Sequence, residues 1–248
     1  MISFARKTTL MQQTPKRINK YISETGFCSR RKVDALIEEQ KIKVNGQLAQ
    51  KGMSVTDNDQ IEIDGTLLNN TKPKQVYLAF NKPIGIECTT NQTIKKNIIS
   101  YINYPERIFP IGRLDKASQG LILLTNDGDI VNQILRSRYH HEKEYIVSVN
   151  KKITPSFIKQ MKNGVPILGQ TTKKCNVFAI NENTFKIILT QGLNRQIRRM
   201  CTYLNYEVTF LKRVRIMDIK LDVSLGKYRV LKEKEIQTLK NQLNQNQF

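Results

Sequence analysis

An aspartate in a glycine-bounded segment is the residue of this chain best suited to chemistry. Asp115 lies in the run GRLDKASQGL, residues 112–121, and an apolar stretch ending at Thr125 follows. Glycine lets the backbone turn sharply and lets a substrate approach closely, and catalytic side chains are often carried by loops on a rigid scaffold. A carboxylate placed there could act as a nucleophile or as a base. The local pattern alone is more typical of a turn or helix-cap aspartate, so the assignment needs further support.

The charge of the chain indicates a polyanionic partner. Its 248 residues include 41 Lys and Arg and 21 Asp and Glu, which gives a net charge of +20. A field of that sign concentrates polyanions and speeds their association. The basic residues gather in two regions, residues 1–36 and 186–215, which suggests two contacts with one extended nucleic acid. An anionic membrane is the weaker alternative, since no basic amphipathic helix is evident and no apolar run approaches the roughly 20 residues that span a bilayer.

A metal site is not expected from the cysteine and histidine pattern. The cysteines are too far apart for a CxxC motif, and the two histidines are adjacent to each other and distant from any cysteine. Free thiols are typical of a reducing cytosol or organelle matrix, and the first residues lack the apolar core of a secretory signal. We therefore expect a cytoplasmic protein. The residues concerned are Cys28, Cys88, Cys175, Cys201, His140 and His141.

A polar segment divides the chain into a small and a large domain. Residues 69–74, with the sequence NNTKPK, contain a proline and no apolar periodicity, which is typical of a linker. We predict a basic tail over residues 1–14, a small domain over 15–70, a linker over 71–75 and a catalytic domain over 76–240.

The small domain has the pattern of two helices followed by two strands. Apolar residues at helical spacing predict a first helix over residues 17–22, and Ser29 is suited to cap a second helix that extends to residue 40. The segments 42–46 and 61–65 alternate and end in Asn-Gly and Asp-Gly, which are strong signals of hairpin turns.

Three cations begin the second predicted helix. Arg30, Arg31 and Lys32 would occupy its first turn, where the helix dipole disfavours positive charge. An anionic partner would explain this arrangement, and a solvated charged face is the alternative. Residues 17–65, which begin with the run RINKYISETGFCSRRKVDALIEEQKIKVNG, resemble an S4 RNA-binding domain. That resemblance implies RNA contacts for Arg17, Lys20, Ser29, Arg30, Arg31, Lys32 and Asn45.

The large domain mixes strands and helices without strict alternation. That arrangement favours an α+β fold built on an antiparallel or mixed sheet. Asp127 and Asp129 are expected to serve as turn and helix-cap residues and not as a second catalytic acid. Strands are predicted over residues 76–80, 121–125, 144–149, 176–180 and 184–190, and helices over 129–136, 155–161 and 195–204.

The segment around the aspartate carries the most specific resemblance. GRLDKASQGL matches the catalytic signature GRLD-x-x-(S/T)-x-GL of the pseudouridine synthases related to RsuA. The segments 81–85, 141–145 and 191–200, with NKPIG, HEKEY and QGLNRQIRRM, are similar to further motifs of that family. The resemblance spans roughly residues 16–235. It implies a small S4-type domain followed by a pseudouridine synthase domain with a mixed or antiparallel sheet.

The resemblance implies an enzyme that isomerises uridine in RNA to pseudouridine. In that reaction the N1–C1′ bond breaks and the uracil is rejoined through C5, so no redox or group-carrying cofactor is needed. The runs GFCSRR, GVPILG and TKKC are most similar to members that modify 23S ribosomal RNA, which implies a specific uridine of that RNA as the substrate. A uridine in a transfer RNA anticodon loop is open as a second substrate, and a monomer is expected.

The resemblance also implies roles for the site residues. Asp115 would be the catalytic carboxylate, Arg198 would lie beside it and favour its charged form, and Tyr145 would stack on the flipped base. Arg195 and Arg199 would point elsewhere from the predicted helix, toward RNA phosphates. Whether Asp115 acts as a nucleophile or as a base, and on which atom, is open. RNA contacts in this domain are implied for Arg113, Arg195, Gln196 and Arg199.

Two other classes of protein share part of this pattern. A non-catalytic S4-type factor for ribosome binding or assembly would explain the charge and the small domain but leaves the large domain without a role. An S4-containing RNA methyltransferase would need a glycine-rich nucleotide loop such as GxGxxG after a strand, and the sequence has none. A pseudouridine synthase is therefore the preferred prediction.

Overall fold

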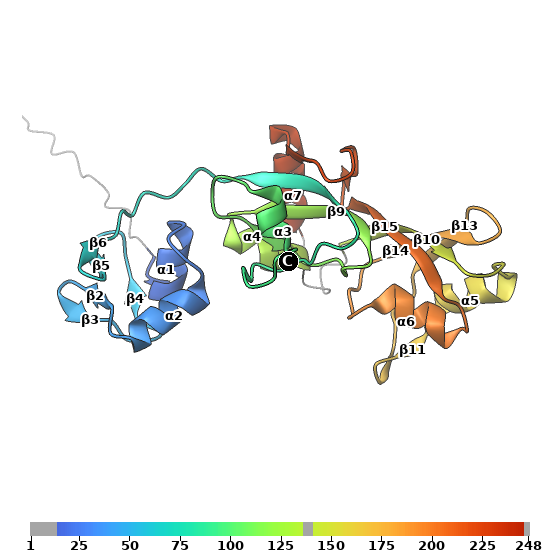
Figure 1. The fold of residues 1–248 in the computed structure, drawn as a ribbon, viewed down its shortest axis with the longest axis horizontal. Helices are drawn as coiled ribbons and strands as arrows, with labels where there is room; N and C mark the ends of the chain where they lie inside the picture. The colour runs from blue at the N-terminus through green and yellow to red at the C-terminus, as the bar shows by residue number, and fades with distance from the viewer. Residues whose placement is uncertain (1–13, 136–140, 246–248) are drawn as a thin grey trace, which may run out of the picture. The chain divides into compact units, whose positions relative to one another are not determined.

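The structure, a computed structural model, describes residues 14–135 and 141–245. The chain forms two compact units, Met1–Lys74 and Gln75–Phe248, which are described separately (Figure 1). In both units the predicted helices and strands are present, with boundaries shifted by at most two residues.

The first unit packs two short helices and its small strands around one core. Helices α1 (Ile18–Glu24) and α2 (Arg30–Glu38) place the apolar residues of their helical pattern in this core. Ser29 caps α2 through a hydrogen bond that its hydroxyl accepts from a backbone N–H of the first turn. Asn45 and Gly46 both have positive φ, as the predicted hairpin turn requires. The strands are β1 (Lys16–Arg17) paired with β4 (Ser54–Val55), and a sheet in the order β3-β2-β5-β6 made of β2 (Ile42–Val44), β3 (Gln47–Leu48), β5 (Ile61–Ile63) and β6 (Thr66–Leu67).

A mixed sheet forms the frame of the second unit. Its main path runs β13-β14-β10-β15-β9-β7-β17, with β16 beside β15 and β8 beside β9. Strands β9 and β15 run parallel, and the other neighbouring strands run antiparallel. The predicted α+β fold is therefore confirmed. The strands are β7 (Tyr77–Lys82), β8 (Phe109–Ile111), β9 (Gln119–Thr125), β10 (Lys143–Val149), β13 (Asn176–Ala179), β14 (Thr184–Leu189), β15 (Val208–Ile216), β16 (Ile219–Lys220) and β17 (Tyr228–Val230).

Helices cover both faces of the sheet around β7 and β9. Alternate residues of these two strands face opposite cores, as the period of a strand requires. One core contains apolar residues of α4 (Gly128–Leu135) and α7 (Glu233–Gln245), and the other contains those of α3 (Ile98–Ile102). β9 is therefore buried on both faces, which gives the loop before it a rigid base.

A third core forms where the sheet continues into β10, β13, β14 and β15. Helices α5 (Pro155–Asn163) and α6 (Gln196–Tyr203) pack against these strands with their apolar sides. The short hairpin of β11 (Pro166–Ile167) and β12 (Gln170–Thr171) lies next to α6. α6 is thereby held in place near the loop that precedes β9.

Two long elements were not predicted from the sequence. β15 has the sequence VTFLKRVRI, whose three cations interrupt the apolar alternation that marks a strand. α7 is rich in Gln, Asn and Lys, and a narrow apolar stripe packs on the core. Arg136, predicted to end α4, lies outside the described residues. No helix among the described residues is long and apolar enough to cross a membrane.

Candidate active site

The loop between β8 and β9 carries Asp115 and is held by backbone hydrogen bonds. The Ser118 N–H donates to the Asp115 carbonyl over 3.0 Å, and the Gly85 N–H donates to the Lys116 carbonyl over 2.8 Å. Gly120 follows the loop and allows β9 to approach β15 closely, since an added Cβ would lie 2.2 Å from a backbone oxygen of β15. These contacts fix the position of Asp115 relative to both strands.

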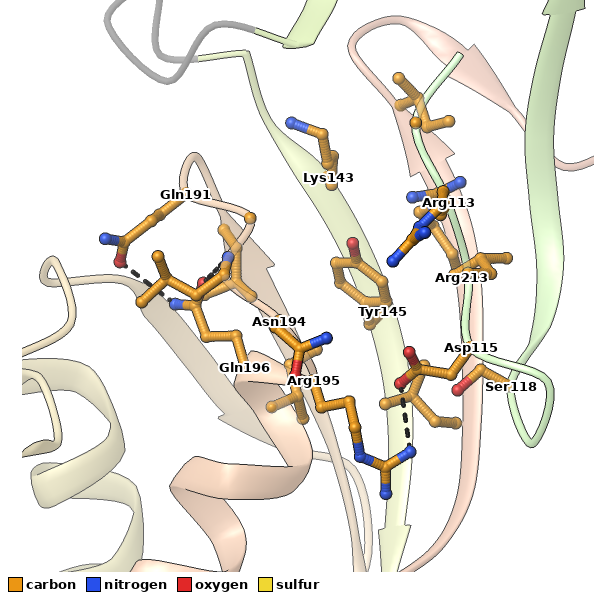
Figure 2. A pocket seen from close by; sticks show the side chains of 18 of the residues that line it. Arg113, Asp115, Ser118, Lys143, Tyr145, Gln191, Asn194, Arg195, Gln196 and Arg213 are labelled. Carbon is orange, nitrogen blue, oxygen red and sulfur yellow. Dashed lines mark hydrogen bonds and ion pairs between the residues drawn. The ribbon is translucent and has the colours of Figure 1, made fainter. Parts of the chain in front are cut away.

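A cavity of about 410 Å³ opens beside Asp115 (Figure 2). Its wall is formed by the Asp115 loop, by β10 and β15, and by the segment that leads into α6. Among the described residues that line it, one carboxylate faces five cations. The aromatic and charged lining residues are Arg113, Asp115, Lys143, Tyr145, Arg195, Arg198 and Arg213.

The ion pair of Asp115 comes from Arg195. Nη1 of Arg195 lies 3.7 Å from Oδ2 of Asp115, and Figure 2 shows the two side chains meeting beside the cavity. The prediction that Arg195 points elsewhere is therefore wrong. It is the N-cap residue of α6 and not a residue of the first turn, and its backbone is left-handed, with a φ of 50°. Helical spacing consequently does not give the direction of its side chain.

Arg198 holds the loop that carries Asp115. Its Nη2 donates to the Ala117 carbonyl over 2.9 Å and to the Ser118 hydroxyl over 3.2 Å, and its Nη1 donates to a carbonyl of β15 over 3.2 Å. Burial, followed by the charge of Arg195, lowers the pKa of Arg198, and the charge of Asp115 opposes that shift. Arg198 therefore links α6 and β15 to the loop.

Tyr145 stands on β10 opposite Arg213 of β15. The two residues are direct partners across the strands, so their side chains share one face of the sheet, and both line the cavity. Tyr145 is half-buried and packs against two apolar cores, which orients its ring. Figure 2 shows the ring in the same cavity as Asp115. An aromatic ring beside a carboxylate is suited to stack on a base that has left its helix.

The other residues that were predicted to bind RNA in this unit have different surroundings. Arg113 is exposed and lines the cavity. Gln196 is buried, and its Oε1 accepts a hydrogen bond over 3.0 Å from a backbone N–H of the segment before α6, which it helps to shape. Arg199 is exposed and donates to Asn194. It lines a second hollow of about 430 Å³ beside α6 and the β11–β12 hairpin, together with the exposed Tyr203.

The predicted RNA contacts of the first unit fall into two groups. One group has partners within the unit: Ser29 caps α2, Asn45 donates to Asp59 over 2.8 Å, and Lys20 pairs with Glu24 at 3.6 Å. The other group consists of exposed cations, most of them in the first turn of α2. These are Arg17, Arg30, Arg31 and Lys32.

Two buried cations of the cavity were not predicted to be functional. Lys143 is 9% exposed, and its Nζ donates to the His141 carbonyl over 3.2 Å. Arg213 is 3% exposed, and its Nε donates to the Leu121 carbonyl over 2.7 Å. Assigning residues 208–216 to a strand would have identified Arg213 as an inward-facing charge, which is a rare arrangement unless the charge is paired.

Comparison with known protein families assigns both units. The S4 domain family matches residues 16–61, and the family described as RNA pseudouridylate synthase matches residues 76–203, which include Asp115, Tyr145 and Arg198. The chain belongs to the RNA pseudouridylate synthase family. It is a pseudouridine synthase with an S4 domain, as the resemblance predicted.

Relatives of the RNA pseudouridylate synthase family match most of the chain. The dual-specificity RNA pseudouridine synthase RluF of Salmonella typhi is 50% identical over 229 residues, which are 92% of this chain and 79% of the relative. Ribosomal large subunit pseudouridine synthase B of Bacillus subtilis is 33% identical over 80% of this chain and 84% of its own length. A crystal structure of a pseudouridylate synthase matches 90% of this chain and 99% of its own, with a TM-score of 0.66 and 27% identity.

Proposed function

We propose that this pseudouridine synthase isomerises a specific uridine of 23S ribosomal RNA, and that a uridine of a transfer RNA anticodon loop is a second substrate. The similar Salmonella protein is named for dual specificity, and the Bacillus protein is named for the large ribosomal subunit. The net charge of +20 and the exposed cations of α2 support a large, folded RNA as the substrate. The enzyme acts as a monomer in the cytoplasm.

The position of Asp115 carries this proposal. It is the sole carboxylate among the described residues that line a cavity rich in cations, and the Tyr145 ring lines the same cavity. In the proposed reaction Asp115 acts as a nucleophile or as a base while the N1–C1′ bond breaks. One carboxylate suffices because the uracil leaves as a stabilised anion and is recaptured in the same cavity. A glycosidase, in contrast, needs a second carboxyl group to protonate an alkoxide.

The other residues of the cavity bind and orient the target nucleotide. The uridine leaves its stack to reach Asp115, and Tyr145 packs against its base. Arg198 positions the catalytic loop through its hydrogen bonds to Ala117 and Ser118. Exposed arginines next to the site contact phosphates of the RNA. The cations of α2 in the S4 domain add contacts that are independent of sequence.

Mapping of pseudouridine in two RNAs tests the proposal. The purified protein is incubated with unmodified 23S ribosomal RNA and with unmodified transfer RNA, and the products are compared with RNA from cells with and without the gene. We expect one position of 23S ribosomal RNA to lose its pseudouridine in cells without the gene and to regain it in vitro. A product confined to transfer RNA would contradict the 23S assignment. No product in either RNA would favour the non-catalytic S4-type assembly factor.

A further inference from the structure

Two buried cations of the catalytic cavity flank the tyrosine ring. Lys143 precedes Tyr145 by two residues on β10, and Arg213 is the direct partner of Tyr145 on β15. Both cations line the cavity, with exposed fractions of 9% and 3%. Figure 2 shows them in the same close-up as the ring and Asp115. A base that stacks on Tyr145 would therefore enter a cavity whose wall carries two buried cations.

Arg213 has a buried donor that the described residues leave unsatisfied. Its Nε donates to the Leu121 carbonyl over 2.7 Å. Its Nη2 is buried and has no hydrogen-bond partner among the residues that the structure describes. A buried donor without an acceptor is costly, and apolar residues of similar volume often replace buried charges without loss of stability. An acceptor that arrives with a ligand would satisfy this donor.

The chemistry of the ligand follows from where the cations lie. Arg113 and Arg195 are exposed and can meet phosphates at the surface, whereas Arg213 and Lys143 meet only what enters the cavity. A flipped nucleotide places its base in the pocket, so the carbonyl oxygens O2 and O4 of uracil are the acceptors that reach them. Burial, followed by the charge of Arg213, lowers the pKa of Lys143 to about 8. An anionic ligand would relieve this repulsion between the two cations.

We propose that Arg213, assisted by Lys143, binds the carbonyl edge of the target uracil and stabilises its negative charge while the ring is detached from the ribose. This inference rests on the proposed function. When N1–C1′ breaks, the electron pair stays on the uracil and is shared by N1, O2 and O4. The ring turns, C5 bonds to C1′, C5 loses its proton and N1 gains one, so substrate and product are isomers.

The packing of β15 against β9 fixes the backbone position of Arg213. Its backbone lies against Gly120 at the end of the catalytic loop, where an added Cβ would be 2.2 Å from the Arg213 carbonyl oxygen. Arg213 and Asp115 are therefore fixed relative to each other through residues 115–120, which form the end of the loop and the start of β9. Donors that are already oriented toward developing charge need no rearrangement during the reaction, and removal of one such donor typically lowers kcat by about 10²–10³-fold.

Substitution of Arg213 tests the inference with single-turnover rates on a stem-loop RNA. We expect Arg213→Gln to lower the rate of pseudouridine formation by about 10²-fold or more and to change RNA affinity by less than about threefold. Lys143→Met should lower the rate by about tenfold, since its amine is the secondary donor. Arg215→Gln is the matched control. Arg215 lies on the same strand outside the cavity lining and pairs with Glu142 and Glu144, so its loss should lower stability without changing the rate.

An RNA with 5-fluorouridine at the target separates charge stabilisation from a structural role. Fluorine stabilises the uracil anion, so the deficit of Arg213→Gln, measured as consumption of 5-fluorouridine, should shrink about tenfold relative to the uridine substrate. Lys143→Met serves for the same comparison if Arg213→Gln does not fold. Equal deficits with both substrates, or an unchanged rate, would overturn the inference and leave the synthase activity intact. If the wild-type protein converts no uridine, the proposed function fails, and this inference fails with it.

Discussion

Cations occupy two contrasting settings in this protein. In the S4 domain, Arg30, Arg31 and Lys32 are exposed in the first turn of α2. In the cavity beside Asp115, Lys143 and Arg213 are buried on neighbouring strands. Exposed cations attract phosphates through interactions that salt screens, whereas buried ones act at short range where the polarity is low. From this contrast we expect the first group to set the affinity for RNA and the second group to set the rate of the reaction.

The largest effect is expected from substitution of Asp115, which should lower kcat but not the affinity for RNA. Asp115→Asn keeps the shape of the side chain and removes its charge, so we expect kcat to fall by more than about 10³-fold. RNA affinity should change by less than about twofold, because the exposed cations that we propose to bind the RNA are untouched. Pseudouridine formation and filter binding with the same RNA measure the two quantities. A large loss of affinity would mean that Asp115 is a structural residue.

The next largest effect distinguishes the two arginines beside Asp115. Arg198→Ala removes hydrogen bonds that hold the Asp115 loop, and misplacement of a catalytic group by about 1 Å can cost about 10²-fold in rate. Arg195→Ala removes an ion pair between partly exposed side chains, so kcat should fall by less than about tenfold. Steady-state kinetics of both variants on one RNA give the comparison. A larger loss of kcat in Arg195→Ala than in Arg198→Ala would show that the ion pair to Asp115 matters more for the rate than the hydrogen bonds that hold its loop.

Many of the helices, strands and turns could be predicted because the sequence patterns that specify them lie within a few neighbouring residues. The cap at Ser29, the apolar spacing of α2 and the turn at Asn45 and Gly46 are each contained in a few neighbouring residues. The run GRLDKASQGL likewise identified the Asp115 loop from one short segment. Elements with weaker local signals were missed, and β15 is the clearest case, because its cations hide the alternation of a buried strand.

The places of Arg195 and Arg213 in the cavity could not be predicted from local patterns. The direction of Arg195 depends on a left-handed backbone before α6, which helical spacing does not describe. Arg213 reaches the cavity through the parallel pairing of β15 with the start of β9, and these segments are far apart in the sequence. The direction of the Arg195 side chain and the position of Arg213 both depend on how the sheet packs. They can therefore be seen in the structure but not in the sequence.

A smaller effect tests the role of the exposed cations of α2. Replacing Arg30, Arg31 and Lys32 by Gln should raise KM for ribosomal RNA and leave kcat unchanged. If each cation contacts one phosphate, the log–log slope of affinity against salt should fall by about 2, since each contact contributes about 0.7 on a single strand. Lys41→Gln with Lys51→Gln is the matched control, because these exposed lysines already pair with glutamates. An unchanged salt slope in the triple variant would mean that α2 does not bind the RNA.

The smallest expected effect concerns the cap that supports those cations. Ser29→Ala removes the hydrogen bond to the Lys32 N–H and should lower the unfolding free energy of the S4 domain by about 1 kcal/mol. Fraying of the first turn would then disorder Arg30 and Arg31 and weaken RNA binding slightly, with kcat unchanged. Ser29→Thr retains the cap and is the control, and urea unfolding followed by circular dichroism measures the stability. If Ser29→Ala weakened RNA binding without loss of stability, the hydroxyl would contact the RNA directly, and α2 would recognise RNA through more than its charge.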